Sequence, residues 1–378
     1  MSLLYVTTYF NSKCKRLHKS KSLECNRLHS RFYGIIREMR GLFMSTIEQV
    51  ALLAKVSVAT VSRVVNNSAY VSEATRERVE QAIKKLNYQP NALGKLLRKE
   101  TTSMVLVLLH SVDNPFFATI VQGIEKVAHE NDYNVLICNT YGDTEREQHY
   151  LKMLRNHLVD GVVFISNTCT SEEINYLNAT FPVVQVVEYL TDIDAAHYSI
   201  DFYQAGKDLM DILYKNGHRS IGFVHTGSTE IVSSKEKFRA YKDFLKERRL
   251  PVITNYPDEC LFGYANAKKI AGDLLDKHPK TTAFFATSDL LACGIIDELN
   301  FRGKSVPKDA MVVGFDNTSY AYVGKPNITS VELNSFQLGA MAMEYLMSKI
   351  KNKPVAHNNK CLIPYQIIER ESTKKDSR

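Results

Sequence analysis

The 378-residue sequence lacks several features that define common protein classes. No apolar run approaches the roughly 18 residues of a membrane-spanning helix, so no membrane partner is expected. The seven cysteines are scattered, without a C-x-x-C pair or a metal-like spacing with histidine. This pattern indicates reduced, structural cysteines, and we expect neither a metal nor a cofactor.

Motifs for common catalytic and nucleotide-binding sites are also missing. The chain has no G-x-G-x-x-G, no G-x-x-x-x-G-K-[ST] and no G-x-S-x-G. The histidines between His110 and His278 follow no ligand spacing. These absences argue against an enzyme, and no catalytic residue is expected.

The region from Thr46 to Asn66 predicts two short amphipathic helices that meet at a tight turn. Thr46 and Gln49 have the spacing of a capping box, so the first helix should begin near Ile47. Its apolar residues recur at helical spacing and predict one buried stripe: Ile47, Val50, Ala51 and Ala54. Ser57 can cap the second helix. The predicted buried face of that helix consists of Val61, Val64 and Val65.

The outer face of the second helix carries small, hydroxyl and basic residues. Small residues such as Val58 and Ala59 at the start of a helix allow close approach to base edges. Hydroxyl groups suit phosphate oxygens, which fix the register on DNA without reading its sequence. The hydroxyl residues are Ser57, Thr60 and Ser62. Arg63 is the best candidate for a two-pronged contact to guanine, so the pattern predicts a helix that enters a DNA groove.

A third helix is predicted after Ser72, with Glu73 in its first turn and Pro90 at its end. Its inward residues are Val79, Ala82, Ile83 and Leu86. A generic three-helix core with a solvated polar face would show the same periodicity. The particular run of residues, however, is far more specific than the periodicity.

The runs VSVATVSRVVNN and VSEATRERVEQAIKKLNYQPNALGKLL resemble the headpiece of the lactose-repressor/galactose-repressor family of bacterial transcription regulators. The resemblance continues through VDNPFF, DGVVFI, NGHRSIGFV, ATSDLLACG, VVGFDN and ERES, over roughly residues 45 to 373. It implies an α/β protein with a small all-α helix-turn-helix headpiece and a hinge, followed by two doubly wound parallel-sheet subdomains of periplasmic-binding-protein type. The residues expected to contact DNA are Thr46, Ser57, Val58, Ala59, Thr60, Ser62, Arg63, Lys95 and Leu97.

Charge is distributed unevenly along the chain. Residues 1–43 carry nine basic and two acidic residues, and residues 44–101 carry nine and five. The remaining residues carry 30 basic and 34 acidic residues, a net charge of −4. A basic headpiece beside an acidic body is the expected charge pattern when one module binds DNA.

Residues 1–43 show no clear helical or strand periodicity. They do not resemble a secretory signal, because their basic residues follow the apolar segment from Leu3 to Phe10. A basic arm with non-specific DNA affinity and a targeting leader are two interpretations. We favour a third, that synthesis begins at Met44 and that the extension is not part of the natural protein. The expected domains are then the headpiece over 44–90, the hinge over 91–101 and the effector-binding and dimerisation domain over 102–373.

The segment after Pro90 is expected to form the hinge. In the family this segment folds into a helix on operator DNA, and paired hinges insert a leucine into the minor groove. Leu97 occupies the position of that leucine, and Gly94-Lys95 stand where the family usually has Ala-Arg. Glycine costs about 1 kcal/mol of helix propensity against alanine, so this hinge should order less readily. A plain linker is the alternative interpretation.

From Met104 onward, apolar β-rich runs alternate with amphipathic helices, which predicts parallel sheets. The expected strands cover 104–109, 134–138, 160–165, 183–187, 220–225, 282–286 and 310–314. The expected helices cover 117–131, 144–157, 171–179, 203–216, 234–248, 264–277, 289–302 and 335–350. By the resemblance, two such units face a ligand cleft, and the last helix returns to the first subdomain.

Ligands of wound sheets bind beyond the carboxyl ends of the strands. The resemblance implies that Phe116 and Phe117 pack on the effector ring. It also implies that the carboxylates of Asp289 and Asp316 accept paired hydrogen bonds from ligand hydroxyls or amines. An aspartate after a strand can instead cap the next helix.

One position departs from the family pattern. Lys237 stands where the family usually has an arginine, and Ala240-Tyr241 replaces a Gly-aromatic pair. Lysine cannot reproduce a planar two-pronged contact, so Lys237 puts the identity of the effector in doubt. Arg239 is an alternative cation for the site.

We therefore expect a sequence-specific transcription regulator, a repressor, that binds a palindromic operator as a homodimer. A small-molecule effector (a sugar, sugar phosphate or nucleoside) should bind in the cleft. The expected location is the bacterial cytoplasm, in association with the nucleoid. A transport-type sugar-binding protein and a regulator with a phosphorylated carrier protein as corepressor are the alternatives.

Overall fold

The computed structural model describes residues 45–66, 69–88, 101–258, 260–354 and 359–374. The chain divides into two compact units, Met1–Glu100 and Thr101–Arg378. The predicted basic extension over 1–43 lies outside the described residues, as does the predicted hinge apart from Thr101. Lys95 and Leu97 therefore stay predictions. None of the helices in the described ranges is long and apolar enough to cross a membrane.

The headpiece consists of α3 (Ile47–Ala54), α4 (Val58–Asn66) and α5 (Glu73–Leu86). The predicted capping box is present, because Thr46 Oγ1 accepts from Gln49 N and Gln49 Oε1 accepts from Thr46 N. The buried residues of this small core all belong to the predicted stripes: Val50, Ala51, Ala54, Val61, Val64, Val79 and Ala82. The other predicted stripe residues are only partly buried: Ile47, Val65, Ile83 and Leu86. Local sequence patterns therefore determine this unit.

Two details of α5 differ from prediction. Ser72 occupies the N-cap position, but its hydroxyl donates to Thr75 Oγ1 at 2.9 Å and does not cap the helix backbone. The helix also ends at Leu86, before the predicted stop at Pro90, because Asn87 adopts a left-handed conformation with φ of 46°. The N–H of this cap residue donates to the carbonyls of Ile83 and Lys84, which satisfies the end of the helix earlier than proline would.

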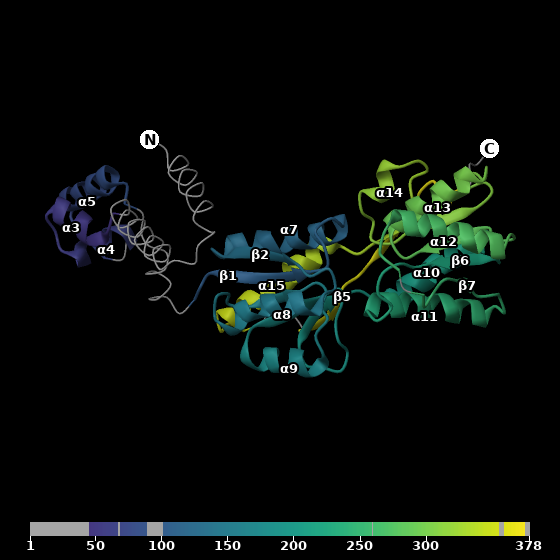
Figure 1. The fold of residues 1–378 in the computed structure, drawn as a ribbon, viewed down its shortest axis with the longest axis horizontal. Coiled ribbons are helices and arrows are strands. Elements are labelled where there is room, and N and C mark those ends of the chain that lie inside the picture. Colours follow the sequence, from purple (N-terminus) through teal and green to yellow (C-terminus); the bar gives the residue numbers. More distant parts are fainter. Residues whose placement is uncertain (1–44, 67–68, 89–100, 259, 355–358, 375–378) are drawn as a thin grey trace, which may run out of the picture. The chain divides into compact units, whose positions relative to one another are not determined.

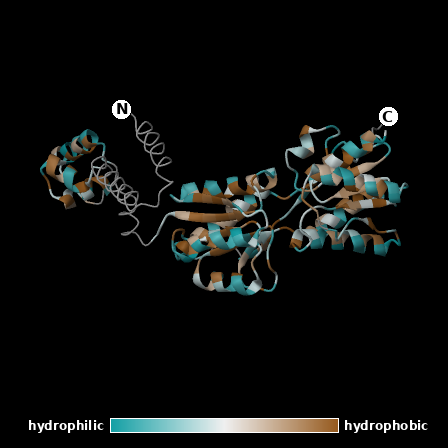
Figure 2. Cartoon of the chain, in the orientation of Figure 1, coloured by the Kyte–Doolittle hydropathy of each residue, from teal (hydrophilic) through white to brown (hydrophobic). Residues whose placement is uncertain are grey.

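The first subdomain of the larger unit is built on a six-stranded parallel sheet in the order β11-β5-β4-β3-β1-β2. Its strands are β1 (Met104–Leu109), β2 (Asn134–Asn139), β3 (Val162–Phe164), β4 (Val183–Val186), β5 (Ala196–Ser199) and β11 (Lys360–Leu362). The helices that belong to it are α7 (Pro115–Glu130), α8 (Thr144–Arg155), α9 (Ser171–Thr180) and α15 (Ser335–Ile350). The apolar residues lie mainly in the strands and on the helix sides that cover them (Figure 2).

The second subdomain has a four-stranded parallel sheet in the order β7-β6-β8-β9. Its strands are β6 (Ile221–Val224), β7 (Ile253–Thr254), β8 (Ala283–Ala286) and β9 (Met311–Val313). Its helices are α10 (Phe202–Lys215), α11 (Val232–Glu247), α12 (Tyr264–Lys277), α13 (Asp289–Phe301) and the short α14 (Tyr320–Val323). Figure 1 shows the two sheets side by side in this unit, each with its own helices, and connecting segments of the chain run between them.

The predicted strands and helices of both subdomains are confirmed with small changes at their ends. Sequence periodicity missed the short strands β5, β7 and β11. It also missed β10 (Ser330–Glu332) and β12 (Gln366–Ile368), which form a separate antiparallel pair. These two strands lie in segments that connect the subdomains, and they are too short to show a pattern.

The long helix α15 packs along α7, as predicted for a helix that returns to the first subdomain. Two glycines allow the two backbones to approach closely. A Cβ on Gly123 would lie 2.0 Å from Phe336 O, and one on Gly339 would lie 2.0 Å from Ile120 O. Only glycine fits at such contacts, so the start of α15 is fixed beside the start of α7.

Candidate functional site

The exposed side of α4 carries the residues predicted to meet DNA. Ser57 Oγ accepts from Thr60 N at 3.1 Å and caps the helix, while the two hydroxyls lie 2.9 Å apart. Val58 is 42% exposed and Ala59 is also exposed, so small side chains surround the helix start. Backbone N–H groups and the positive end of the helix dipole are directed there, which suits a phosphate.

Arg63 is exposed and forms no hydrogen bond or ion pair with the residues described here. Its guanidinium group can therefore reach a guanine edge without breaking an internal contact. Ser62 is half-buried, and Asn66 Nδ2 donates to its carbonyl at 2.9 Å and to its hydroxyl at 3.2 Å. The Thr46 hydroxyl likewise accepts a hydrogen bond from Gln49 N, which caps α3. Arg63 is thus the freest polar side chain of the predicted reading surface.

In the larger unit, a cavity of about 400 Å³ lies where the two subdomains meet. Phe116 and Thr119 line it from α7 of the first subdomain. The loop after β9 contributes Asp316, Asn317 and Thr318. The end of β10 and the start of α15 contribute Glu332, Asn334, Ser335, Phe336 and Gln337. The cavity therefore lies at the carboxyl end of β9, where ligands of wound sheets bind.

Asp316 and Phe116 are the predicted effector residues that line this cavity. The backbone of Asp316 has a φ of 92°, an uncommon and strained value for a residue other than glycine. Its carboxylate forms no hydrogen bond with the residues that the structure covers. Burial raises the pKa of Asp316 to about 6; Lys237 opposes this shift, and Glu188 and Glu332 reinforce it.

Lys237, on α11, is only 6% exposed. Its Nζ donates to Thr287 O at 3.1 Å and lies 3.8 Å from the centre of the Phe315 ring. Burial lowers the pKa of Lys237, while the charges of Asp316, Glu188 and Asp289 oppose that shift. Lys237 is therefore an internal cation held by the chain's own carboxylates and an aromatic face. It is not among the residues that line the cavity.

Sequence analysis did not identify Glu188, a buried carboxylate that joins the two subdomains. It follows β4 of the first subdomain and accepts from the backbone N–H of Ser233 at 3.1 Å and from the Ser233 hydroxyl. Ser233 lies at the start of α11 in the second subdomain, so Glu188 caps a helix across the boundary. Burial raises the pKa of Glu188, against the hydrogen bonds from Ser233 and the charge of Lys237. A glutamate directly after a buried strand was the available sequence signal.

Asp289 is fully buried and its oxygens are already engaged by the protein. Oδ2 accepts from Thr318 N at 2.6 Å and from Thr318 Oγ1 at 3.0 Å, and Oδ1 accepts from Ser330 Oγ at 2.5 Å. Burial raises the pKa of Asp289 to about 7, and the charge of Asp316 adds to the shift. In this structure Asp289 holds the loop that carries Asp316, and its expected contact with an effector stays a prediction.

One of the two phenylalanines predicted to pack on the effector lines the cavity. Phe116 lines the cavity, and its ring centre lies 5.3 Å from that of Phe117, which is half-buried and outside the lining. Phe336 supplies a second ring in the lining that sequence analysis did not identify. Arg239 does not replace the family arginine, because it pairs with Glu236 and lies over the Tyr203 ring at 4.0 Å.

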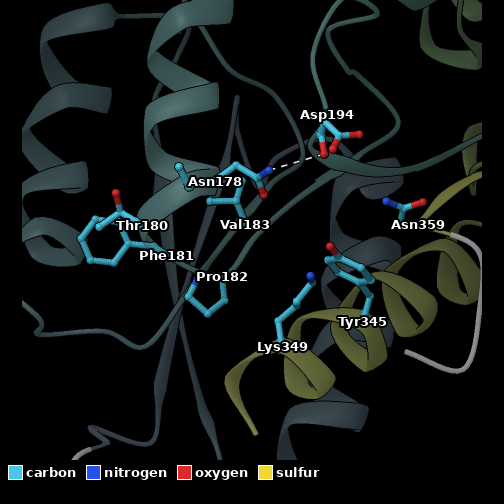
Figure 3. A pocket seen from close by; sticks show the side chains of 10 residues that line it. Asn178, Thr180, Phe181, Pro182, Val183, Asp194, Tyr345, Lys349 and Asn359 are labelled. Carbon is cyan, nitrogen blue, oxygen red and sulfur yellow. Dashed lines mark hydrogen bonds between the residues drawn. The ribbon is translucent and has the colours of Figure 1, made fainter. Parts of the chain in front are cut away.

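A second hollow of about 270 Å³ lies on the first subdomain (Figure 3). Tyr345 and Lys349 point into it from α15, opposite Asn178 and Asp194. Asn178 Nδ2 donates to Asp194 O at 3.4 Å. This hollow precedes β4 and β5, at the sheet edge opposite the carboxyl ends, so its position does not favour an effector site.

Comparison with known proteins agrees with this combination of a helix-turn-helix and a two-subdomain ligand-binding fold. The family model described as bacterial regulatory proteins, lacI family, matches residues 46–91, and the periplasmic binding protein-like domain matches residues 210–373. Catabolite control protein A of Priestia megaterium is 34% identical over 330 residues, which cover 87% of this chain and 99% of that protein. The ribose operon repressor of Halalkalibacterium halodurans is 34% identical over 332 residues, 88% of this chain and 98% of that protein.

Solved structures give the same result for the fold. The lac repressor dimer bound to operator and the anti-inducer ONPF has a TM-score of 0.77 at 22% identity, covering 87% of this chain and 99% of that one. The transcriptional regulator CelR in complex with cellobiose has a TM-score of 0.63 at 28% identity, with the same coverage. The fold and site define a DNA-binding transcription regulator with a ligand-binding body. The chain belongs to the lacI family of bacterial regulatory proteins.

Proposed function

We propose that this regulator is a homodimeric repressor that releases or binds a palindromic operator in response to a small molecule in the cavity between its subdomains. Relatives at 34% identity are named as a catabolite control protein and an operon repressor, and one solved neighbour is a repressor dimer on its operator. A two-fold dimer presents two α4 helices to two half-sites, which is why a palindromic sequence is expected. The relatives named here are regulators and not enzymes, and we expect the protein to act at DNA in the bacterial cytoplasm.

On the DNA side, we assign groove reading to Val58, Ala59 and Arg63, and backbone contacts to Ser57 and Thr60. Thr46 and Ser62 would contact phosphates while keeping their internal bonds. Lys95 and Leu97 would contact the minor groove from the hinge.

On the ligand side, the observation that supports the proposal is Asp316. Its carboxylate accepts no hydrogen bond from the described residues and lies in a cavity lined by both subdomains. Phe116 would pack against the ligand, with Phe117 behind it. Lys237 and Asp289 would act on the ligand through Asp316, the first as its counter-charge and the second as the support of its loop. A ligand that binds one arrangement of the subdomains better than another would shift the population of DNA-binding dimers.

The test joins the two sites in one experiment. Operators are first selected from random duplex DNA, and a thermal-shift screen then covers sugars, sugar phosphates and nucleosides. A compound that binds should change operator affinity measured by fluorescence anisotropy, and Asp316→Ala should weaken its binding without changing DNA affinity in its absence. Selection of no palindromic sequence, or an operator affinity independent of every compound that binds, would refute the proposal.

A further inference from the structure

The residues that line the cavity carry an excess of negative charge. Its lining contains two acidic residues, Asp316 and Glu332, and no lysine, arginine or histidine. The other lining groups are neutral amides, hydroxyls and two phenylalanines. A ligand in this space therefore meets negative potential at short range, in surroundings where charges are poorly screened.

Two buried or half-buried cations near the cavity, Lys237 and Arg370, are already bonded to groups of the protein. Lys237 is buried, donates to Thr287 O, lies on the Phe315 ring and is attracted to Glu188 as well as Asp316. Its single charge is therefore shared among three carboxylates, those of Asp316, Glu188 and Asp289.

Arg370, a second cation near the cavity, is engaged in the same way. Its guanidinium group donates to Ile328 O at 2.8 Å and to Asn317 Oδ1 at 2.6 Å. Neither of these two cations is directed at the cavity. Lys126 is exposed on α7 and its Nζ lies 5.9 Å from the centre of the Phe336 ring, but it is not one of the lining residues. Within the lining itself a phosphate would therefore find no charged partner.

The two acidic lining residues differ in their bonding. Glu332 is satisfied, because Oε2 accepts from Asn317 Nδ2 at 2.7 Å and Oε1 accepts from Asn334 N at 2.8 Å. Asp316 accepts no hydrogen bond from the described residues, although strained backbone holds it in place. A buried anion of this kind is costly unless a partner supplies a hydrogen bond or a charge.

We propose that the effector is a hydroxylated amine, such as an amino sugar, whose ammonium group pairs with Asp316 while its ring or carbon face packs on Phe116 and Phe336. This inference rests on the proposed function of the cavity and restricts its ligand class: it favours cations over neutral sugars and excludes sugar phosphates. A cation offsets the repulsion that Asp316 receives from Glu188 and Glu332, and a neutral hydroxyl offsets it less. Phenylalanine faces add attraction for an ammonium group.

The experiment compares matched triplets by isothermal titration calorimetry on the full chain. Each triplet contains an amino sugar, its neutral parent and the parent's 6-phosphate: glucosamine, glucose and glucose 6-phosphate, with the galactose and mannose series beside them. In at least one triplet we expect the amine to bind about 10-fold or more tightly than the parent, and the phosphate to bind more weakly than either. The preference should shrink between pH 7.5 and pH 5.5, as Asp316 becomes protonated beside Lys237, Glu188, Glu332 and Asp289.

Asp316→Asn should remove the preference for the amine, while Asp273→Asn on the exposed side of α12 should leave it unchanged. Circular dichroism checks that Asp316→Asn is folded, and Glu332→Gln provides a second variant, expected to weaken the preference partially. Equal or tighter binding of the parent or phosphate overturns the charge inference and leaves the cavity as an effector site. If no member of any triplet binds, the hydroxylated-amine inference fails. The wider thermal-shift screen then decides separately whether the cavity binds any effector.

Discussion

The headpiece and the cavity present their functional groups in opposite ways. In the headpiece, the groups suited to DNA come from one continuous stretch, are exposed or half-buried, and include an arginine without a partner among the described residues. In the cavity, the groups come from α7, the β9 loop, β10 and α15, and their charges are partly buried and coupled. A single substitution on α4 can thus alter DNA recognition alone. A substitution in the cavity also alters the free energy of unfolding.

The largest expected effect concerns the internal cation. Lys237→Ala leaves Glu188 and Asp316 without their counter-charge, so the larger unit should lose about 3–5 kcal/mol of unfolding free energy. Urea denaturation followed by circular dichroism measures this loss. The matched control is Lys235→Ala on the same helix, whose exposed ion pair with Glu230 should contribute less than about 1 kcal/mol. Equal losses for the two variants would contradict the assigned role of Lys237.

The second largest expected effect is a pH-dependent stabilisation, which results from the removal of the Asp316 charge. Burial raises the pKa of Asp316 to about 6, above its ordinary value of 3.8, so the folded state binds more protons than the unfolded state between these values. Its contribution to stability is therefore complete below pH 4 and is lost as the pH rises through 6. Asp316→Asn should be about 2–3 kcal/mol more stable than the parent protein at pH 7.5. That advantage should disappear by about pH 4, and a gain that is constant from pH 4 to pH 7.5 would exclude this cause.

In the headpiece, Arg63→Ala should leave the fold intact, because Arg63 has no bond to the described residues. Loss of a two-pronged guanine contact costs about 1–3 kcal/mol of discrimination, or roughly 5- to 150-fold. Fluorescence anisotropy with selected and scrambled operators gives this ratio, and calorimetry with an effector should give an unchanged affinity. Retained selectivity would show that α4 reads DNA through other residues.

The smallest effect is expected at the turn of the helix-turn-helix. Lys55 has a φ of 54°, in the left-handed region that glycine adopts without strain. Lys55→Gly should stabilise the headpiece by about 0.5–1 kcal/mol, whereas Lys55→Ala should have almost no effect because it keeps the strained Cβ. Hydrogen exchange of the α3 and α4 amides reports the difference. Stabilisation by both variants would mean that the lysine charge, and not its backbone, is unfavourable.

The contrast between the headpiece and the cavity also explains which features could be predicted from the sequence. The capping box at Thr46, the stripe around Val50 and the long helices α7 and α15 follow from local spacing, and the structure has all of them. The structural roles of Asp289 and Glu188 depend on hydrogen-bond partners that lie 29 and 45 positions away in the chain, respectively. Periodicity holds no information about such partners. The short strands β10 and β12 were not predicted for the same reason, since each is defined by its pairing with the other.

The close packing of α15 on α7 also has a consequence for the order in which the protein becomes functional during synthesis. The headpiece core closes within residues 45–88, so it can fold while the ribosome is still translating the body. The first subdomain cannot, because α15 and the sheet strand β11 are made after the whole second subdomain. A nascent chain therefore acquires a DNA-binding surface before it acquires a ligand cavity. A truncated product that ends before Ser335 would retain the headpiece and lack its regulation.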